Sequence, residues 1–173
     1  GLVYGLSNDG VLVCCKVDGG EVVWQTSFPK DFGGKIESSW GYSESPLIDG
    51  DLLICTPGAP DAMVAALNKK TGEVIWKGKA PSGKLRGNDG AGYSSVIISN
   101  ATGVKQYVQL VGHGMVSYNA KTGDLLWNYD RVANTTANIP TPIAKDDYIF
   151  CSTGYDDGGT ALLKITKKGT KLD

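Results

Sequence analysis

A ten-residue segment that recurs three times constrains the fold more than any other feature of this sequence. The copies read CKVDGGEVVW, LNKKTGEVIW and YNAKTGDLLW, and they align without gaps. Their turn glycines and final tryptophans are equivalent: Gly20, Gly72 and Gly123, and Trp24, Trp76 and Trp127. The glycines are 52 and then 51 residues apart, and a weaker fourth copy, Lys164 to Gly169, ends 46 residues after Gly123. A fixed period of this length indicates a repeat architecture.

Each copy predicts a strand, a tight turn and a second strand. Glycine at the turn can adopt a positive φ without steric cost, and the apolar β-formers and tryptophan after it form the outgoing strand. Upstream of the later copies lie further predicted hairpins: Pro46 to Cys55, Ser94 to Val111 and Pro142 to Cys151. Four short antiparallel strands in about 50 residues are typical of a β-propeller blade. A β-sandwich also has many short strands, but it has no reason to repeat them at a fixed spacing.

The predicted fold is therefore all-β: a partial β-propeller of about 3.5 four-stranded antiparallel blades in one incomplete domain, residues 1–173. We divide it into half a blade (1–26), two whole blades (45–77 and 93–129) and a blade that lacks its last strand (140–173). Propellers close with about four to eight blades. The expected partners are thus the remaining blades, from the same polypeptide or from another copy.

The turn-and-tryptophan unit resembles the tryptophan-docking motif of PQQ-like (quinoprotein-type) propellers. Thr71-Gly72…Trp76 and Thr122-Gly123…Trp127 carry it, and Gly19-Gly20…Trp24 carries it in altered form. The stretches SSWGYSESPLIDGDLLICTPG and YDRVANTTANIPTPI resemble exported bacterial quinoprotein-dehydrogenase-like propellers. A related branch is the propeller lipoprotein of outer-membrane protein assembly, which binds partners. The resemblance implies that tryptophans dock between blades and that the protein is periplasmic or secreted.

Composition narrows the function classes. The 17 basic residues nearly balance the 18 acidic ones and do not cluster, so we expect no nucleic-acid partner. No run of apolar residues approaches the roughly 20 needed for a membrane span. Cys14, Cys15, Cys55 and Cys151 lie in apolar strand-like runs and are interpreted as small buried hydrophobic residues.

Candidate site residues lie in the long connections between the blades, at residues 27–44, 78–92 and 130–139. Tyr93 lies at the start of the next strand, and His113 lies in a middle turn, the turn between the two middle strands of a blade. Long loops on a rigid scaffold commonly carry function, so we expect the face that they share to bind the ligand. The ligand-binding candidates are Trp40, Tyr42, Glu44, Arg86, Asn88, Tyr93, His113, Arg131 and Asn138. No catalytic residue can be assigned, and no metal site is predicted because His113 has no second ligand at metal spacing. Asp146-Asp147 and Asp156-Asp157 are interpreted as turn residues.

Three functions are compatible with these observations. The first is a binding or scaffold propeller, whose ligand or partner is a protein, a peptide or a sugar. The second, from the family resemblance, is a segment of a PQQ- and calcium-dependent quinoprotein alcohol dehydrogenase, with PQQ and calcium as possible cofactors. The third is carbohydrate binding by Trp40, Tyr42 and Tyr93, because aromatic faces suit sugar rings.

Overall fold

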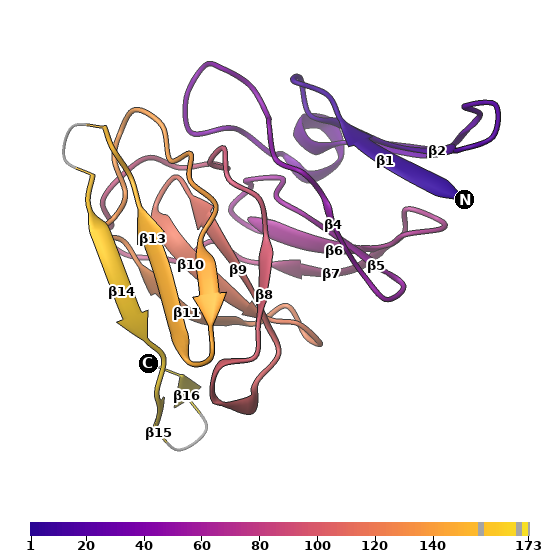
Figure 1. Cartoon of the computed structure of the whole chain (residues 1–173). Coiled ribbons are helices and arrows are strands. Elements are labelled where there is room, and N and C mark those ends of the chain that lie inside the picture. The colour runs from indigo at the N-terminus through magenta and orange to yellow at the C-terminus, as the bar shows by residue number, and fades with distance from the viewer. Residues whose placement is uncertain (156–157, 169–170, 173) are drawn as a thin grey trace.

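The computed structural model describes residues 1–155, 158–168 and 171–172, and these residues are almost entirely β-structure (Figure 1). They form three- and four-stranded antiparallel sheets, one short hairpin and two helical turns. The N-terminal sheet comprises β1 (Leu2–Leu6), β2 (Val11–Lys16) and β3 (Val22–Ser27), and η1 (Phe28–Phe32) follows it. The next sheet comprises β4 (Leu47–Asp49), β5 (Leu52–Cys55), β6 (Val64–Asn68) and β7 (Val74–Gly78).

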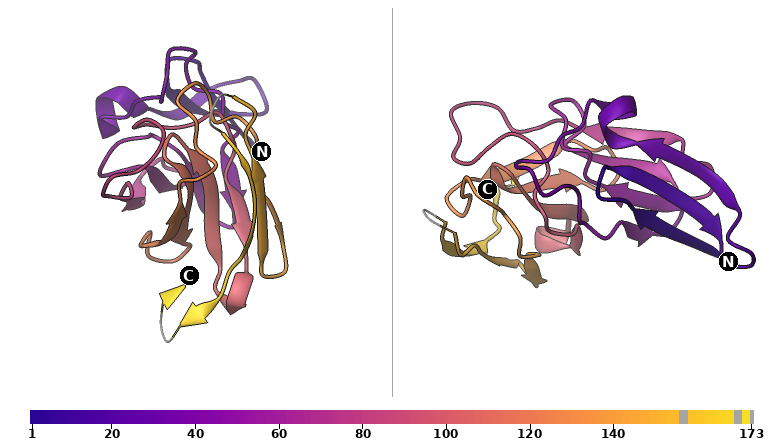
Figure 2. Two further views of the ribbon diagram at one scale, coloured as in Figure 1. Left: turned by 90° about the vertical axis from the view of Figure 1, so that its left-hand side faces the viewer. Right: turned by 90° about the horizontal axis from the view of Figure 1, so that it is seen from above.

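The remaining sheets complete the row. The third comprises β8 (Ile97–Ser99), β9 (Gln106–Val111), β10 (Gly114–Asn119) and β11 (Leu125–Tyr129), with η2 (Ala101–Gly103) after β8. The fourth comprises β12 (Ile143–Lys145), β13 (Tyr148–Ser152) and β14 (Thr160–Lys164), and the hairpin comprises β15 (Lys167–Lys168) and β16 (Lys171–Leu172). The two termini lie at opposite ends of the row of sheets (Figures 1 and 2). The partial propeller predicted from the sequence is confirmed.

The N-terminal sheet differs from the expected division, whereas the C-terminal sheet lacks a fourth strand as expected. The N-terminal sheet has three strands rather than the two of half a blade, because Leu2–Leu6 pairs along its whole length with β2. At the other end, β12–β14 also has three strands, and the chain then turns into β15–β16 instead of adding a fourth strand to this sheet.

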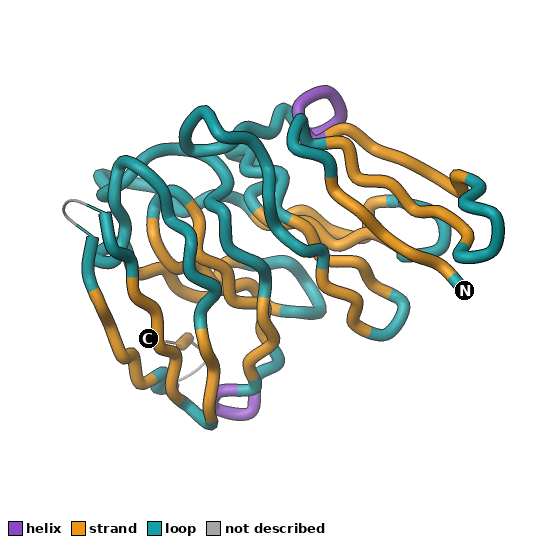
Figure 3. The backbone as a smooth tube through the Cα atoms, turned by 45° about the horizontal axis from the view of Figure 1, so that its top comes forward, coloured by secondary structure: helices purple, strands orange, loops and turns teal. Residues whose placement is uncertain are grey.

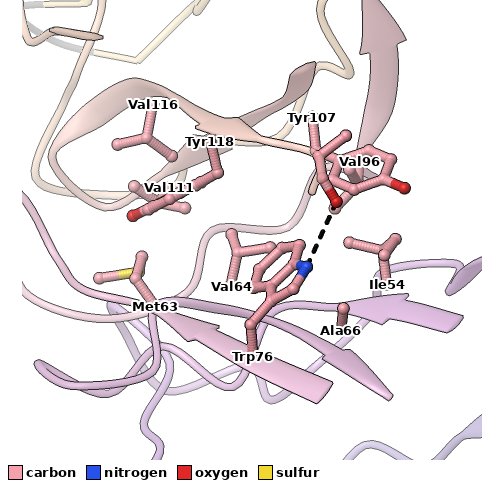
Figure 4. Close-up of a cluster of buried hydrophobic side chains, with 11 residues drawn as sticks. Ile54, Met63, Val64, Ala66, Trp76, Val96, Tyr107, Val111, Val116 and Tyr118 are labelled. Carbon is pink, nitrogen blue, oxygen red and sulfur yellow. Dashed lines mark hydrogen bonds between the residues drawn. The ribbon is translucent and has the colours of Figure 1, made fainter. Parts of the chain in front are cut away.

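Burial along the strands reflects the stacking of the blades. β9 and β10 are buried along nearly their whole length because their sheet packs between two others. In β1, by contrast, half-buried residues alternate with exposed ones. The cores therefore lie between neighbouring sheets. Figure 4 shows one of them, where Ile54, Val64 and Trp76 meet Tyr107 and Tyr118 of the next blade.

Each of the first two repeat tryptophans docks on the turn of the following blade. A Cβ built on Gly72 would lie 2.8 Å from the Trp24 ring, and one on Gly123 would lie 2.6 Å from the Trp76 ring. The indole nitrogens donate to main-chain oxygens of the same turns, Trp24 to Lys69 at 3.1 Å and Trp76 to Ala120 at 3.3 Å. Glycine is required because only a residue without a side chain leaves room for the indole.

Trp127 is held differently. Its indole nitrogen donates to Gln106 Oε1 at 2.8 Å, within its own blade. The glycine of the fourth copy, Gly169, lies outside the described residues.

Candidate functional site

The long connections between blades gather on one side of the molecule and form a bonded layer (Figure 3). Ala91 N donates to Lys35 O and Glu37 N donates to Ala91 O, both at 2.9 Å, so the first two connections pair. Gly112 lies in the middle turn between β9 and β10, and its main-chain N donates to Gly90 O at 3.0 Å. The loops thus support one another and present a fixed surface.

An open cleft of about 300 Å³ lies in this face. Its lining is mainly apolar and aromatic and consists of Trp40, Ser43, Tyr93, Ala137, Ile139 and Tyr155. Ser43, Tyr93 and Ile139 each lie four residues before the first strand of a whole or terminal blade, β4, β8 or β12. The first strands of neighbouring blades converge, as the contact between β8 and β12 shows, so the cleft lies at the end of the inner strands, at the mouth of the propeller axis.

Two aromatic rings form one wall of the cleft. The Trp40 and Tyr93 ring centroids are 6.1 Å apart with an interplanar angle of 55°. Trp40 is 59% exposed, whereas the Tyr93 hydroxyl is hydrogen-bonded to the Ser38 hydroxyl. Asn8 Nδ2 donates to Trp40 O at 2.7 Å and fixes the backbone. The Trp40 ring is therefore available to a ligand while its main chain is held in place.

The segments that lead into the first strand of each blade are joined by hydrogen bonds to side-chain hydroxyl groups. Ser45 N donates to Ser95 Oγ at 2.9 Å, and Ser95 N donates to Thr141 Oγ1 at 3.1 Å. These three residues are equivalent, since each lies two positions before the first strand of its blade. The repeat therefore builds a ladder from blade to blade.

Glu44 is buried next to this ladder rather than exposed in the cleft. Its Oε1 accepts from Thr56 N at 2.6 Å, while its Oε2 has no partner within the described residues. Burial raises the pKa of the Glu44 carboxyl to about 7, although the hydrogen bonds from Thr56 act in the opposite direction.

A polar cluster around His113 joins the connection after β7 to the middle turn between β9 and β10. His113 Nδ1 lies 2.7 Å from Arg86 O, and His113 Nε2 lies 2.8 Å from Asp89 Oδ1. Both ring nitrogens thus face acceptors, and both can donate only in the imidazolium form. The hydrogen bonds from His113 and Lys35 lower the pKa of the Asp89 carboxyl. This group ties loops together at the surface.

Besides Glu44, two of the expected ligand-binding side chains lie inside the protein instead of on the open face. Tyr42 is 6% exposed; its ring packs on Phe28 and its hydroxyl donates to Pro57 O at 2.9 Å. Asn138 is fully buried, and its main-chain N donates to Glu37 Oε1 at 2.6 Å. Both are internal because the connections fold back over the middle turns.

Glu37 is the residue that sequence reasoning missed. Its carboxylate accepts from both the main chain and the side chain of Asn138, which is 101 residues away. Burial raises the pKa of Glu37 in spite of these bonds. No local signal in the loop sequence GGKIESSW, residues 33–40, distinguishes such an anchor from a surface glutamate.

The other candidates are spread over the same face. Asn88 Nδ2 donates to Thr135 O at 2.9 Å, and Arg86 donates to Arg131 O at 3.1 Å. Arg131 itself is exposed. Of the nine candidates, the structure brings only Trp40 and Tyr93 together in the cleft.

A calcium and PQQ site was tested against the residues present. Calcium takes six to eight oxygen ligands, usually including several carboxylates. Within residues 1–155, 158–168 and 171–172, no group of three His, Cys, Asp or Glu side chains could hold a metal ion. The described residues therefore do not provide the carboxylate set that calcium needs beside PQQ. In the same part of the chain, no helix is long and apolar enough to cross a membrane.

The stacked sheets, the turn glycines and the docked tryptophans define a PQQ-like β-propeller segment. A family model described as outer membrane protein assembly factor BamB matches residues 1–170, and the chain belongs to this family of PQQ-like propellers. No curated protein matches the chain.

Solved propellers share the fold at low sequence identity. Quinohemoprotein alcohol dehydrogenase from Comamonas testosteroni matches with a TM-score of 0.58 and 15% identity over 95% of this chain. The enzyme ADHIIG from Pseudomonas putida HK5 gives a TM-score of 0.51 and 17% identity over 95% of this chain. The chain spans 30% and 29% of these two enzymes. BamB from Moraxella catarrhalis gives a TM-score of 0.41 and 15% identity, over 99% of this chain and 62% of that one.

Proposed function

We propose that this chain is a segment of an exported, periplasmic binding propeller, and that the cleft at the mouth of the axis holds the ligand. The observation that carries this proposal is the aromatic wall of Trp40 and Tyr93 beside Ile139 and Tyr155, on a layer of mutually bonded loops. Trp40, Ile139 and Tyr155 are 59%, 48% and 45% exposed. Large exposed apolar side chains that gather in a cleft are typical of interaction sites.

The chemistry of the cleft favours an apolar or aromatic side chain of a protein or peptide partner. Aromatic residues supply large contact areas at a low cost in conformational entropy, which is why binding sites are rich in them. The family supports this proposal, since its model is described as an assembly factor.

A peptide library displayed on phage, followed by titration of the tryptophan fluorescence, tests the proposal. We expect enriched peptides with an aromatic or branched apolar anchor, and Trp40→Ala should weaken their binding at least tenfold. Arg131→Ala, on the same face but outside the cleft, is the matched control and should keep the affinity. Equal losses in both variants, or no enrichment, would reject the cleft as the peptide site.

Two other outcomes would point to the other functions. A glycan array that binds the chain through Trp40, with no peptide enriched, would favour the carbohydrate-binding alternative. Reduction of a dye by alcohols after addition of PQQ and calcium would show a quinoprotein dehydrogenase and would reject the scaffold proposal.

A further inference from the structure

Two buried oxygen atoms in one hydrogen-bonded cluster have no donor within the described residues: Glu44 Oε2 and Gln109 Oε1. Glu44 is 7% exposed and Gln109 is 1% exposed. Thr56 connects them, because its amide donates to Glu44 Oε1 at 2.6 Å and its hydroxyl oxygen accepts from Gln109 Nε2 at 3.0 Å. Buried acceptors without donors are unfavourable and rare in native structures, so each requires an explanation.

The neighbouring blade shows that the scaffold does not need a carboxylate at this position. Ser94 is equivalent to Glu44, since each lies three residues before the first strand of its blade. The Ser94 hydroxyl accepts from Leu110 N at 3.3 Å and donates to Leu110 O at 3.0 Å. Leu110 is equivalent to Thr56 in the strand register. A hydroxyl therefore closes this contact, whereas Glu44 closes it with one oxygen and retains a second oxygen that has no partner within the described residues.

The orientation of the Gln109 amide follows from its partners. Its Nε2 donates to Thr56 Oγ1 at 3.0 Å and to Ser94 O at 2.9 Å, so Oε1 must be the free acceptor. A rotated amide would set its oxygen against the Ser94 carbonyl. The cluster consequently offers two oxygen acceptors and no free N–H donor from Gln109.

The chemistry of these two atoms selects their ligand. Carboxylate and amide oxygens are the ligands that hard cations prefer. One carboxylate is balanced by one positive charge. Burial raises the pKa of Glu44, hydrogen bonds from the Thr56 hydroxyl and amide lower it, and no cationic side chain of the described residues contributes to the shift.

We propose that Glu44 Oε2 and Gln109 Oε1 bind a monovalent cation, K⁺ or Na⁺, between the second and third sheets near the axis. Glu44 precedes β4 and Gln109 lies in β9, so the cation joins two neighbouring blades. The bound charge keeps the carboxylate ionised in a place where burial alone favours the protonated form. Neither Glu44 nor Gln109 lines the peptide cleft.

Thermal unfolding in matched salts tests this site. The chain is melted near pH 8 in KCl, NaCl and choline chloride at about 0.15 M each, because choline is too large to enter and the ionic strength stays constant. We expect the wild-type melting temperature to be about 5 °C lower in choline than in the better alkali salt. Glu44→Gln should melt at one temperature in all three salts.

Two further variants keep the test decisive. Glu44→Ser restores the residue that serves in the next blade, and it should fold and lose the cation dependence even if Glu44→Gln folds poorly. Asp61→Asn removes an exposed carboxylate and should keep the wild-type dependence. Equal melting of the wild type in all three salts, or the same dependence in both Glu44 variants, would overturn the proposal. Crystals grown with Tl⁺ should show an anomalous peak beside Glu44 Oε2, and a water-sized peak without anomalous signal would also overturn it.

Discussion

Replacing the glycine on which a tryptophan docks measures the interaction that orders the blades. Gly123 has a φ of +75°, and alanine in this left-handed region costs about 1–2 kcal/mol. The added Cβ would lie 2.6 Å from the Trp76 ring, far inside the roughly 3.5–4.0 Å of a favourable carbon contact. Overpacking of this kind costs about 1–3 kcal/mol, so we expect Gly123→Ala to lower the free energy of unfolding by about 2–5 kcal/mol.

Gly20 is the matched control within the same chain. It occupies the equivalent turn of the first repeat with a φ of +69°, and an added Cβ would meet nothing within 4 Å. Gly20→Ala should therefore cost only the backbone strain, about 1–2 kcal/mol. The difference between the two variants is the steric cost of placing a Cβ against the docked indole.

Urea unfolding, followed by circular dichroism, gives both free energies. In a Trp76→Ala background, the cost of Gly123→Ala should fall to that of Gly20→Ala, because interacting residues are not additive. Equal costs at Gly20 and Gly123, or an undiminished cost in the Trp76→Ala background, would refute the docking argument.

Three further predictions concern the stability of two variants and the dependence of stability on pH. Trp40→Ala should change the free energy of unfolding by less than about 0.5 kcal/mol in urea, because Trp40 is 59% exposed; a larger loss would contradict its place in an open cleft. Tyr42→Phe should cost about 1 kcal/mol in the same assay and leave peptide affinity unchanged, since its hydroxyl bonds Pro57 O inside the protein. With choline as the only cation, stability should fall as pH rises from about 4.5 to about 7 and then level off, because Glu44 has a pKa near 7 when folded and keeps a proton that the unfolded chain loses. Melts of Glu44→Gln across this range should lack that slope.

The repeat made most of the fold predictable. Turn glycines followed by β-formers and tryptophan are local signals, and their fixed spacing indicated equivalent units before any contact was known. The docking of Trp24 and Trp76 was implied by the resemblance to the tryptophan-docking motif, and the structure shows it. Half a blade was expected at the N-terminus, and the structure shows that Leu2–Leu6 adds a third strand to the sheet there.

The binding face was less predictable. Trp40, Tyr42 and Tyr93 are similar aromatic residues in neighbouring loops, yet two line the cleft and Tyr42 packs inside. Loops have no period that fixes the direction of a side chain. Their side chains are oriented by contacts with other blades, as when Glu37 binds Asn138 across 101 residues.

The sequence by itself determined the period, the turns and the equivalence of Trp24 and Trp76, because these depend on signals that recur within each repeat. Only the tertiary structure decided which loop residues face the solvent and which are buried. It also placed Glu44 beside Gln109, since that neighbourhood arises where two different blades meet.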